Sequence, residues 1–271
     1  NSYHFQDSFL ALQVGIPILV EKPISDSLGD AAKLIELGRK TNVPILTGYH
    51  RRHNSRVFEV KKKLDEGYIG TVVAMHGMFW LYKPDDYFDQ VWRKKAGAGP
   101  IYINLSHDID LMRHLLGEVE SVQAISKNEI RGFDVEDTAV AILNFSSGIV
   151  GSISISDTIV SPWSYELTSN ENPAYHHTPG NCYWIGGTDG SIEFPKGTFW
   201  SHKGQKSWWE PISSTKIENK KSNPILNQLD NFLNVILGND KPLVSGLEGL
   251  KTSAVIDLSL IHISEPTRLG F

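Results

Sequence analysis

The chain has 271 residues, of which 40% are apolar and 21% charged, and its formal net charge is −5. This length is ample for one large or two modest domains, and the acidic balance excludes a broad basic surface for nucleic acid or anionic lipid. Every apolar run is shorter than the roughly 20 residues that a membrane-spanning helix needs. Cys182 is the sole cysteine, which excludes an intrachain disulfide and a cysteine-based zinc site. We therefore expect a cytoplasmic protein whose partner is a small molecule, without nucleic-acid or membrane partners.

Both ends of the sequence are unusual. The chain starts without methionine, in Asn1-Ser-Tyr-His4, so we expect an amino-terminal segment, with any signal peptide, to be missing. Residues 258–268 match, in one reading frame, the translation of a common transposon-type sequencing adapter. We interpret 258–271 as a read-through artefact and leave it out of the fold prediction.

Residues 1–50 alternate between helical and strand patterns. Apolar residues recur at helical spacing over 3–14 and again over 26–42. Two short apolar runs, at 18–20 and 43–48, predict strands buried on both faces, as in a parallel sheet. Helix, strand, helix and strand with short joints indicate a parallel, doubly wound sheet. The sequence has no Gly-x-Gly-x-x-Gly phosphate-binding motif; if one exists, we expect it in the missing segment.

The pattern changes after residues 49–54. A basic amphipathic helix is predicted at 57–64, an alternating strand at 71–81, a polar aromatic loop up to Gly99 and a helix at 100–116. Strands with turn signals dominate from 119 to about 199, apart from an irregular stretch at 161–181. A loop is predicted at 203–222, followed by helices at 224–237 and 247–257. The fold class is thus α/β plus α+β, in which the partial parallel sheet precedes a large, mainly antiparallel open sheet with helices on one side.

Charged residues follow the first predicted strand directly, in Glu21-Lys22-Pro23. Open α/β sheets bind ligands at the carboxyl ends of their strands, so a lysine held there can meet a substrate. The alternative is that Glu21 and Lys22 form a solvated pair at the mouth of a loop.

The helix predicted at 100–116 has an unusual polar side. Leu105, Ile109, Met112 and Leu116 form an apolar stripe, and the opposite side carries Asn104, His107, Asp110 and His114. Asn, His and Asp beside a glycine-rich entry favour a cleft lining over a solvated face. Two alternatives stay open: a core histidine paired with Asp108 or Asp110, and a His–Asp–His metal site.

Other candidates carry weaker signals. Arg51, Arg52 and His53 follow the second predicted strand and can neutralise a substrate carboxylate, or form a solvated basic turn. Several aromatic and imidazole side chains suit sugar stacking, or a core or interface, namely Trp80, Tyr82, Trp163, Tyr165, His176 and His177. Trp208 and Trp209, in a polar loop, suit an oligomer contact or a lid.

Together these stretches resemble the Gfo/Idh/MocA oxidoreductases. The resemblance covers nearly all of residues 1–257 and depends on the order and spacing of several motifs. They are Asn1-Ser-Tyr-His4, Glu21-Lys22-Pro23, Gly48, Trp92-Arg93, the Gly97–Pro100 turn, His107-Asp-Ile-Asp110, Gly187-Thr-Asp-Gly190 and the Pro224…Gln228…Phe232 helix. The resemblance implies that 1–50 is the end of a dinucleotide-binding Rossmann domain and that 51–257 is a substrate and oligomerisation domain.

The resemblance also implies an activity. The chain is expected to transfer a hydride between NAD or NADP and a secondary hydroxyl of a sugar, cyclitol or polyol acid. His107 would be the general base, and Lys22 would orient the hydroxyl and stabilise negative charge on its oxygen. The expected substrate-binding residues are Asn104, Asp110, Arg51 and Tyr82, and the expected cofactor-binding residues are Asn1, His4, Glu21, Lys22, Trp92 and Arg93. A homo-oligomer through the open sheet is expected, and no metal.

One position departs from the family pattern. Many relatives have an aspartate four residues before the histidine, where this chain has Ile103. Asn104, one residue later, can hydrogen-bond a substrate but cannot act as a base, so the acidic role is lost, moved to Asp110 or unnecessary. A reductase with the same fold, or a non-catalytic relative that senses a dinucleotide for regulation, is the alternative. The presence of both Lys22 and His107 argues against a non-catalytic relative.

Overall fold

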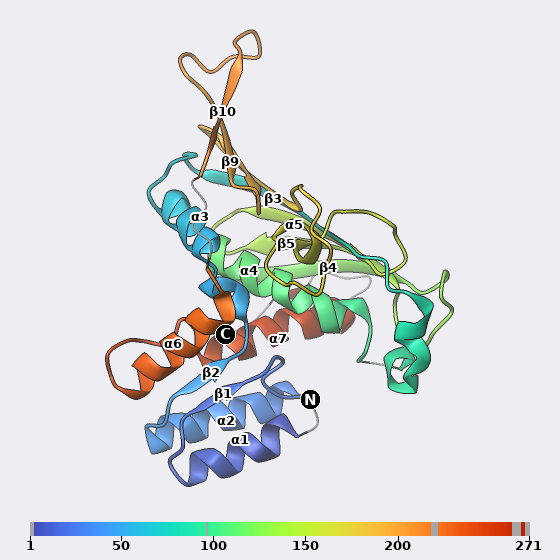
Figure 1. Cartoon of the computed structure of the whole chain (residues 1–271), viewed down its shortest axis with the longest axis vertical. Helices are drawn as coiled ribbons and strands as arrows, with labels where there is room; N and C mark the ends of the chain where they lie inside the picture. The colour runs from blue at the N-terminus through green and yellow to red at the C-terminus, as the bar shows by residue number, and fades with distance from the viewer. Residues whose placement is uncertain (1–2, 96, 218–221, 262–266, 269–271) are drawn as a thin grey trace.

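The computed structural model describes residues 3–95, 97–217, 222–261 and 267–268. The amino-terminal part is a small parallel α/β unit at the bottom of Figure 1. Strand β1 pairs in parallel with β2, so that Ile18 lies opposite Ile45, as predicted. Its elements are α1 (His4–Gln13), β1 (Ile18–Val20), α2 (Leu28–Thr41) and β2 (Ile45–Thr47).

Helix α2 has clear sequence-encoded ends. The Ser27 hydroxyl accepts a hydrogen bond of 3.1 Å from the Asp30 amide, which caps the first turn. Asn42 ends the helix in the left-handed conformation, with φ of 53°. Leu12 of α1 and Ala31 and Leu34 of α2 are buried in one cluster against β2.

The second part is a large twisted sheet. Its order is β10-β9-β8-β7-β3-β6-β5-β4-β11; among the described strands β3 and β6 pair in parallel and the other neighbours are antiparallel. This agrees with the predicted mainly antiparallel open sheet. The strands are β3 (Val72–Trp80), β4 (Val119–Lys127), β5 (Thr138–Phe145), β6 (Val150–Ser156), β7 (Tyr183–Gly187), β8 (Ser191–Phe194), β9 (Thr198–His202), β10 (Ile212–Lys216) and β11 (Thr267–Arg268).

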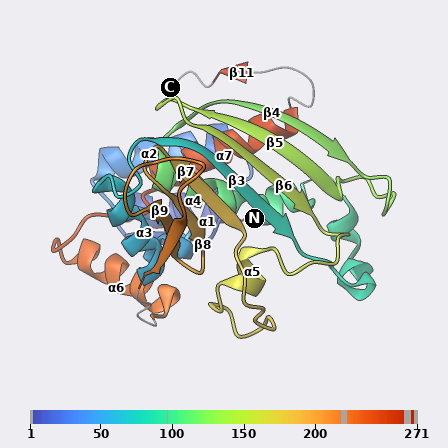
Figure 2. The same cartoon turned by 90° about the horizontal axis from the view of Figure 1, so that it is seen from above.

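Helices cover one face of this sheet. Seen from above, β3 to β7 lie in front of α4 and α7 (Figure 2). Inward side chains such as Phe79, Leu143 and Ile153 pack with Ile109 and Met112 of α4, whereas alternate residues of the same strands face outward. The helices are α3 (Ser55–Asp65), α4 (Ser106–Leu116), α5 (Tyr165–Thr168), α6 (Pro224–Ile236) and α7 (Gly246–Ile261).

Four details differ from the sequence prediction. The helix expected at 100–116 begins with a π-helical turn, Ile101–Leu105, before α4. The stretch expected to be irregular, 161–181, contains α5. The expected loop at 203–222 contains β10, which pairs with β9 through backbone hydrogen bonds despite its polar sequence. Helix α7 continues to Ile261 and β11 pairs with β4, so 258–261 and 267–268 adopt regular structure; the rest of 258–271 lies outside the described residues.

The carboxyl-terminal helices return to the amino-terminal unit. The Thr47 amide of β2 donates a 3.0 Å hydrogen bond to the Val244 carbonyl, and Leu46 forms a bridge with Ser245. Helix α7 thereby packs against α2 and β2 as well as α4 and β4. Among the described residues, no helix combines the length and apolar character needed to cross a membrane.

Candidate active site

Lys22 lies where β1 ends and reaches across to the second part of the chain. Its Nζ donates a 2.6 Å hydrogen bond to the carbonyl of Ile103, in the π-helical turn before α4. The strand end is closely packed, because a Cβ on Gly48 would lie 3.2 Å from the Glu21 Cα. This contact brings the Glu21-Lys22-Pro23 segment to the start of the helix that carries His107.

The environment of Lys22 makes it less basic. Burial lowers its pKa to about 8, and the neighbouring positive charge of Arg51 adds to the effect. Glu21, Glu166 and Asp108 act in the opposite direction but do not restore the usual value. Lys22 therefore titrates close to neutral pH.

The π-helical turn beside Lys22 is fixed at its start. Glu136 Oε1 accepts a 2.9 Å hydrogen bond from the Ile101 amide, and a Cβ on Gly99 would overlap the same carboxylate. Single π-helical turns are frequent at functional sites because they change which side chains face a cleft. Here the turn carries Asn104, whose buried Oδ1 has no hydrogen-bond partner among the described residues.

His107 begins the first regular turn of α4. Its ring meets those of Tyr49 and His50 edge-on, at centroid distances of 5.7 and 5.4 Å. Its Nδ1 is buried and has no hydrogen-bond partner among the described residues. Burial lowers the pKa of His107 well below its usual value, and the positive charges of Lys22 and Arg51 lower it further. The imidazole is therefore neutral at neutral pH.

A pocket of about 500 Å³ opens beside Lys22. One of its edges is formed by the indole of Trp92, which is 55% exposed. The lining residues are Lys22, Pro23, Trp92, Lys95, Gly97, Ala98, Tyr102 and Ile103. The pocket is formed by two segments that the sequence analysis identified separately, namely the end of β1 and the glycine-rich turn.

Arg51, predicted to bind substrate, is paired with two carboxylates of the protein. It is 2% exposed, and its guanidinium pairs with Glu166 at 2.5 Å and Asp108 at 3.3 Å. The guanidinium also lies 4.3 Å from the centroid of the Tyr165 ring. Two carboxylates already neutralise the arginine, so its effect on Lys22 and His107 is electrostatic and indirect.

Asp110, also predicted to bind substrate, is likewise held by side chains of the protein. It is fully buried, and Arg52 donates to both of its carboxylate oxygens, at 2.9 and 2.7 Å. Thr252 of α7 donates a further hydrogen bond of 3.2 Å. The residues of the predicted polar side of the helix therefore have two different environments. His107 lies near Lys22, whereas Asp110 takes part in a cluster of ion pairs.

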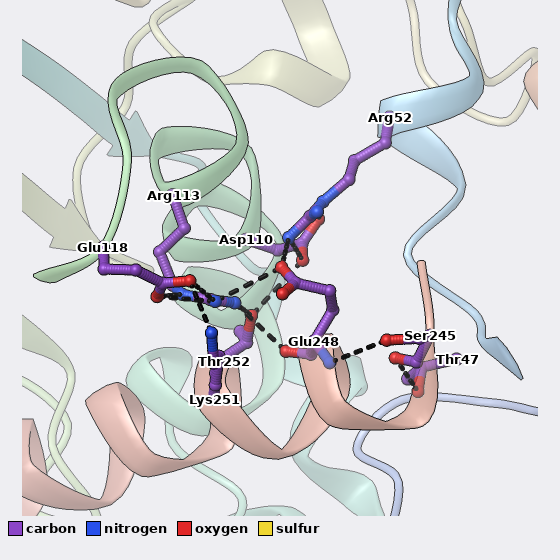
Figure 3. Close-up of polar contacts among 9 residues, drawn as sticks. All are labelled: Thr47, Arg52, Asp110, Arg113, Glu118, Ser245, Glu248, Lys251 and Thr252. Carbon is purple, nitrogen blue, oxygen red and sulfur yellow. Dashed lines mark hydrogen bonds and ion pairs between the residues drawn. The ribbon is translucent and has the colours of Figure 1, made fainter. Parts of the chain in front are cut away.

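Figure 3 shows this cluster, in which cationic and anionic side chains come from α4, from α7, from the turn after β2 and from the segment that follows α4. Arg52 also bonds Glu248 at 3.0 Å, and Arg113 joins Glu248 at 3.2 Å and Glu118 at 2.8 Å. Lys251 completes it with a 2.8 Å bond to Glu118. We name these six residues, Arg52, Asp110, Arg113, Glu118, Glu248 and Lys251, the ion-pair cluster.

The predicted cofactor-binding residues are only partly brought together. His4 Nδ1 donates to the Pro23 carbonyl at 2.7 Å, which ties α1 to the Lys22 turn, and Glu21 Oε2 accepts the Lys22 amide at 3.3 Å. Trp92 lines the pocket, whereas Arg93 bonds the Tyr87 carbonyl at 2.7 Å and stacks on the Tyr87 ring. Asn1 lies outside the described residues.

The remaining aromatic candidates are scattered. Tyr82 is 46% exposed, lies near Arg131 and is not among the residues that line the Lys22 pocket. Trp80 pairs with Trp163, while Trp208 and Trp209 are 90% and 83% exposed. Within the described ranges, no three His, Cys, Asp or Glu side chains are grouped so as to hold a metal ion, so the His–Asp–His alternative has no support.

Sequence reasoning named Asp108 only as an alternative partner of His107, and it missed His50 and Glu166. Asp108 is fully buried, accepts from the Tyr183 hydroxyl and pairs with Arg51. Burial raises the pKa of Asp108. The usable signal for His50 was its position directly after the second parallel strand; Glu166 lies in the irregular stretch and had no local signal.

Comparison with known proteins places this site in a family. The model of the GFO/IDH/MocA C-terminal domain matches residues 57–193. Levoglucosan dehydrogenase of Pseudarthrobacter phenanthrenivorans is 24% identical over 221 residues, covering 72% of this chain and 53% of that protein. Myo-inositol 2-dehydrogenase of Thermotoga maritima is 32% identical over 144 residues, covering 50% of this chain and 41% of that protein. The chain thus spans about half the length of the curated relatives that it matches.

The fold has solved counterparts. The WlbA dehydrogenase of Bordetella pertussis, crystallised with NADH and UDP-GlcNAcA, superposes with a TM-score of 0.75 at 23% identity. The alignment covers 100% of this chain and 77% of that one. At this level of identity the likeness establishes the fold.

The ion-pair cluster generates a stability prediction. Asp110→Leu should destabilise the protein by about 3–5 kcal/mol, because it removes the bidentate partner of buried Arg52. The double variant Arg52→Met/Asp110→Leu should recover most of that loss, since both charges then leave the interior. Urea denaturation measures both, with Asp30→Ala on exposed α2 as a control that should change little. An Asp110→Leu variant as stable as the control would contradict a structural role for the pair.

Proposed function

The chain belongs to the GFO/IDH/MocA family, and from this premise we propose that it acts as an NAD(P)-dependent oxidoreductase. The reaction is hydride transfer between the nicotinamide and a secondary hydroxyl of a sugar or cyclitol. The observation that carries the proposal is the meeting of Lys22, from the end of β1, with the π-helical turn that leads into His107. The proposed division of labour is residues 1–50 for the dinucleotide and 51–257 for the substrate, in the cytoplasm.

The residues at the pocket suit a flat cofactor ring. The pocket of about 500 Å³ is bordered by the Trp92 indole and by the small residues Gly97 and Ala98. Lys22, Pro23 and Trp92 would hold the nicotinamide end there, and the unpartnered Asn104 Oδ1 offers a buried acceptor to a ligand donor. The nicotinamide, when bound, takes up or gives the hydride.

The protein side chains handle the proton. Oxidation of a secondary hydroxyl releases the hydroxyl proton as the hydride leaves the same carbon. Neutral His107 accepts that proton at Nε2, since its Nδ1 is the buried ring nitrogen. The ammonium of Lys22 stabilises the negative charge that develops on the substrate oxygen, and burial strengthens this interaction.

The charges around the site favour a neutral polyol over an acid. Arg51, the cation expected to bind a substrate carboxylate, is already paired with Glu166 and Asp108. Two relatives are named for levoglucosan and myo-inositol, which are uncharged polyols. We therefore place the substrate among sugars, anhydrosugars and cyclitols. A dinucleotide-sensing regulator is the alternative, and turnover distinguishes the two.

The outer face of the large sheet is the proposed oligomer interface. Side chains of adjacent strands are exposed there although they are apolar, among them Val140 and Ile142 of β5 and Val150 of β6. A hollow of about 630 Å³ on the same face is lined by Ile142, His76, Trp184 and Trp200. An extended apolar face of this kind fits a second copy of the chain.

Substrate turnover tests the function. The full-length protein should reduce NAD or NADP with levoglucosan or myo-inositol. Lys22→Ala should lower kcat/KM by about 10²–10³-fold, through loss of charge stabilisation on the oxygen. His107→Gln should lower it by about 10²–10⁴-fold, through loss of the base. Lys33→Ala on exposed α2 is the matched control and should behave as wild type. Unaltered turnover in Lys22→Ala would refute its role.

The pH dependence follows from the lowered pKa of Lys22. Because the ammonium is the active form, kcat/KM for oxidation should fall as pH rises through about 8. On the acid side, activity should persist well below the ordinary histidine pKa, because His107 stays neutral there. Lys22→Arg, which stays charged, should retain residual activity without the alkaline fall. An alkaline fall of the same midpoint in Lys22→Arg would show that another group causes it.

Solution mass tests the interface. Wild-type protein should run as an oligomer in size-exclusion chromatography with light scattering, and Ile142→Glu on the sheet face should shift it to the monomer. Ile130→Glu, also an exposed apolar site but outside the strands, should leave the mass unchanged. An Ile142→Glu protein of wild-type mass would exclude this face.

A further inference from the structure

His107, the base in the proposed reaction, must pass on the proton that it accepts from the substrate. His107 Nδ1 is buried without a hydrogen-bond partner among the described residues. Burial and two neighbouring cations lower the pKa of His107, so its imidazolium form is unstable. A proton accepted from substrate therefore needs an acceptor close to His107.

His50 is the ring next to His107 that can serve as this acceptor. The two rings meet edge-on with their centroids 5.4 Å apart, closer than the Tyr49 ring at 5.7 Å. Tyr49, the other flanking ring, is unsuitable as a carrier because burial raises the pKa of its hydroxyl far above its usual value. The His50 side chain is 31% exposed, so it links the buried base to the surface.

Glu171 holds His50 from the outer side. Its Oε1 lies 3.2 Å from His50 Nε2. Its other oxygen accepts hydrogen bonds from the Tyr165 hydroxyl at 2.6 Å and Asn54 Nδ2 at 3.0 Å, which fixes the carboxylate. Glu171 also lines a cavity of about 380 Å³ with Asn54 and Ser169, separate from the Lys22 pocket.

We propose that His50 is a proton relay between His107 and solvent, and that Glu171 is the positioning residue that orients it. This inference rests on the proposed hydride-transfer function and assigns to it a proton path. The path runs from the substrate hydroxyl through His107 and His50 to the cavity beside Glu171.

The proton steps balance without another reactant. The substrate O–H bond breaks and a proton binds His107 Nε2, while the electron pair of the C–H bond leaves as hydride to the oxidised nicotinamide. His107 then releases a proton to the neighbouring His50 ring, and so returns to the neutral form. His50, whose side chain is 31% exposed, in turn loses its Nε2 proton to solvent beside the ionised Glu171.

The carboxylate of Glu171 suits this role. Burial raises its pKa, but hydrogen bonds from His50 and Tyr165 outweigh burial and bring the pKa below its usual value. Glu171 therefore stays ionised, and its negative charge, 3.2 Å from His50 Nε2, stabilises the imidazolium that forms transiently.

The experiment uses the full-length protein with oxidised nicotinamide and a polyol that the wild type oxidises. The variants are His50→Gln, His50→Gly and Glu171→Gln. His53→Gln is the matched control, because His53 lies on the same turn, is equally an imidazole and has a pKa lowered by burial to about 4. The readouts are kcat, KM, the solvent deuterium isotope effect on kcat and rescue by added imidazole.

His50→Gln should lower kcat by about 10- to 100-fold with KM nearly unchanged, and should raise the solvent isotope effect. Added imidazole should restore turnover in His50→Gly in proportion to its concentration. Glu171→Gln should lower kcat less, and His53→Gln should match wild type.

Unchanged kcat and isotope effect in His50→Gln would overturn the relay alone. So would a loss confined to KM, which indicates substrate binding, or a loss of kcat that imidazole does not rescue. Absence of hydride transfer by the wild type would overturn the proposed function, and the relay with it.

Discussion

The ion-pair cluster is the constraint on which the site depends. Arg52 follows β2 in the turn that carries His50, Asp110 lies one turn beyond His107 on α4, and Glu248 belongs to α7, which also packs on β2. A bidentate Arg–carboxylate pair fixes direction as well as distance. Apolar residues of the same volume would give similar stability, but they would not fix the rotation of α4 that brings His107 toward Lys22.

The pKa values at the site are set by two cations, Lys22 and Arg51, that lie in a largely buried environment. Lys22 and Arg51 both act on His107, and burial weakens the basicity of Lys22 and His107 together. Arg51 keeps its charge because Asp108 and Glu166 surround it. The outcome is a neutral imidazole and an ammonium that titrates near neutrality, which is the pairing that removal of a hydroxyl proton requires.

Much of this arrangement could be predicted from sequence, for identifiable reasons. The branched run Ile18–Val20 and the amphipathic pattern of α2 are local signals, and they correctly predicted the parallel pair. Helical periodicity placed His107 and Asp110 on one side of α4, but periodicity does not identify partners. Arg52 captures Asp110 from a segment 58 residues away, which separates it from His107. The π-helical turn and the pairing of polar β10 depend on tertiary contacts with Glu136 and β9, so neither was predictable locally.

The central claim is that Lys22 and His107 act on one substrate oxygen. The most direct test is a crystal structure of the full-length protein with oxidised nicotinamide and a polyol that it turns over slowly. Lys22 Nζ should leave the Ile103 carbonyl or share it, and Nζ and His107 Nε2 should both lie within about 3.2 Å of the same hydroxyl oxygen. A substrate hydroxyl at the hydride-transfer position that contacts neither side chain would contradict the account.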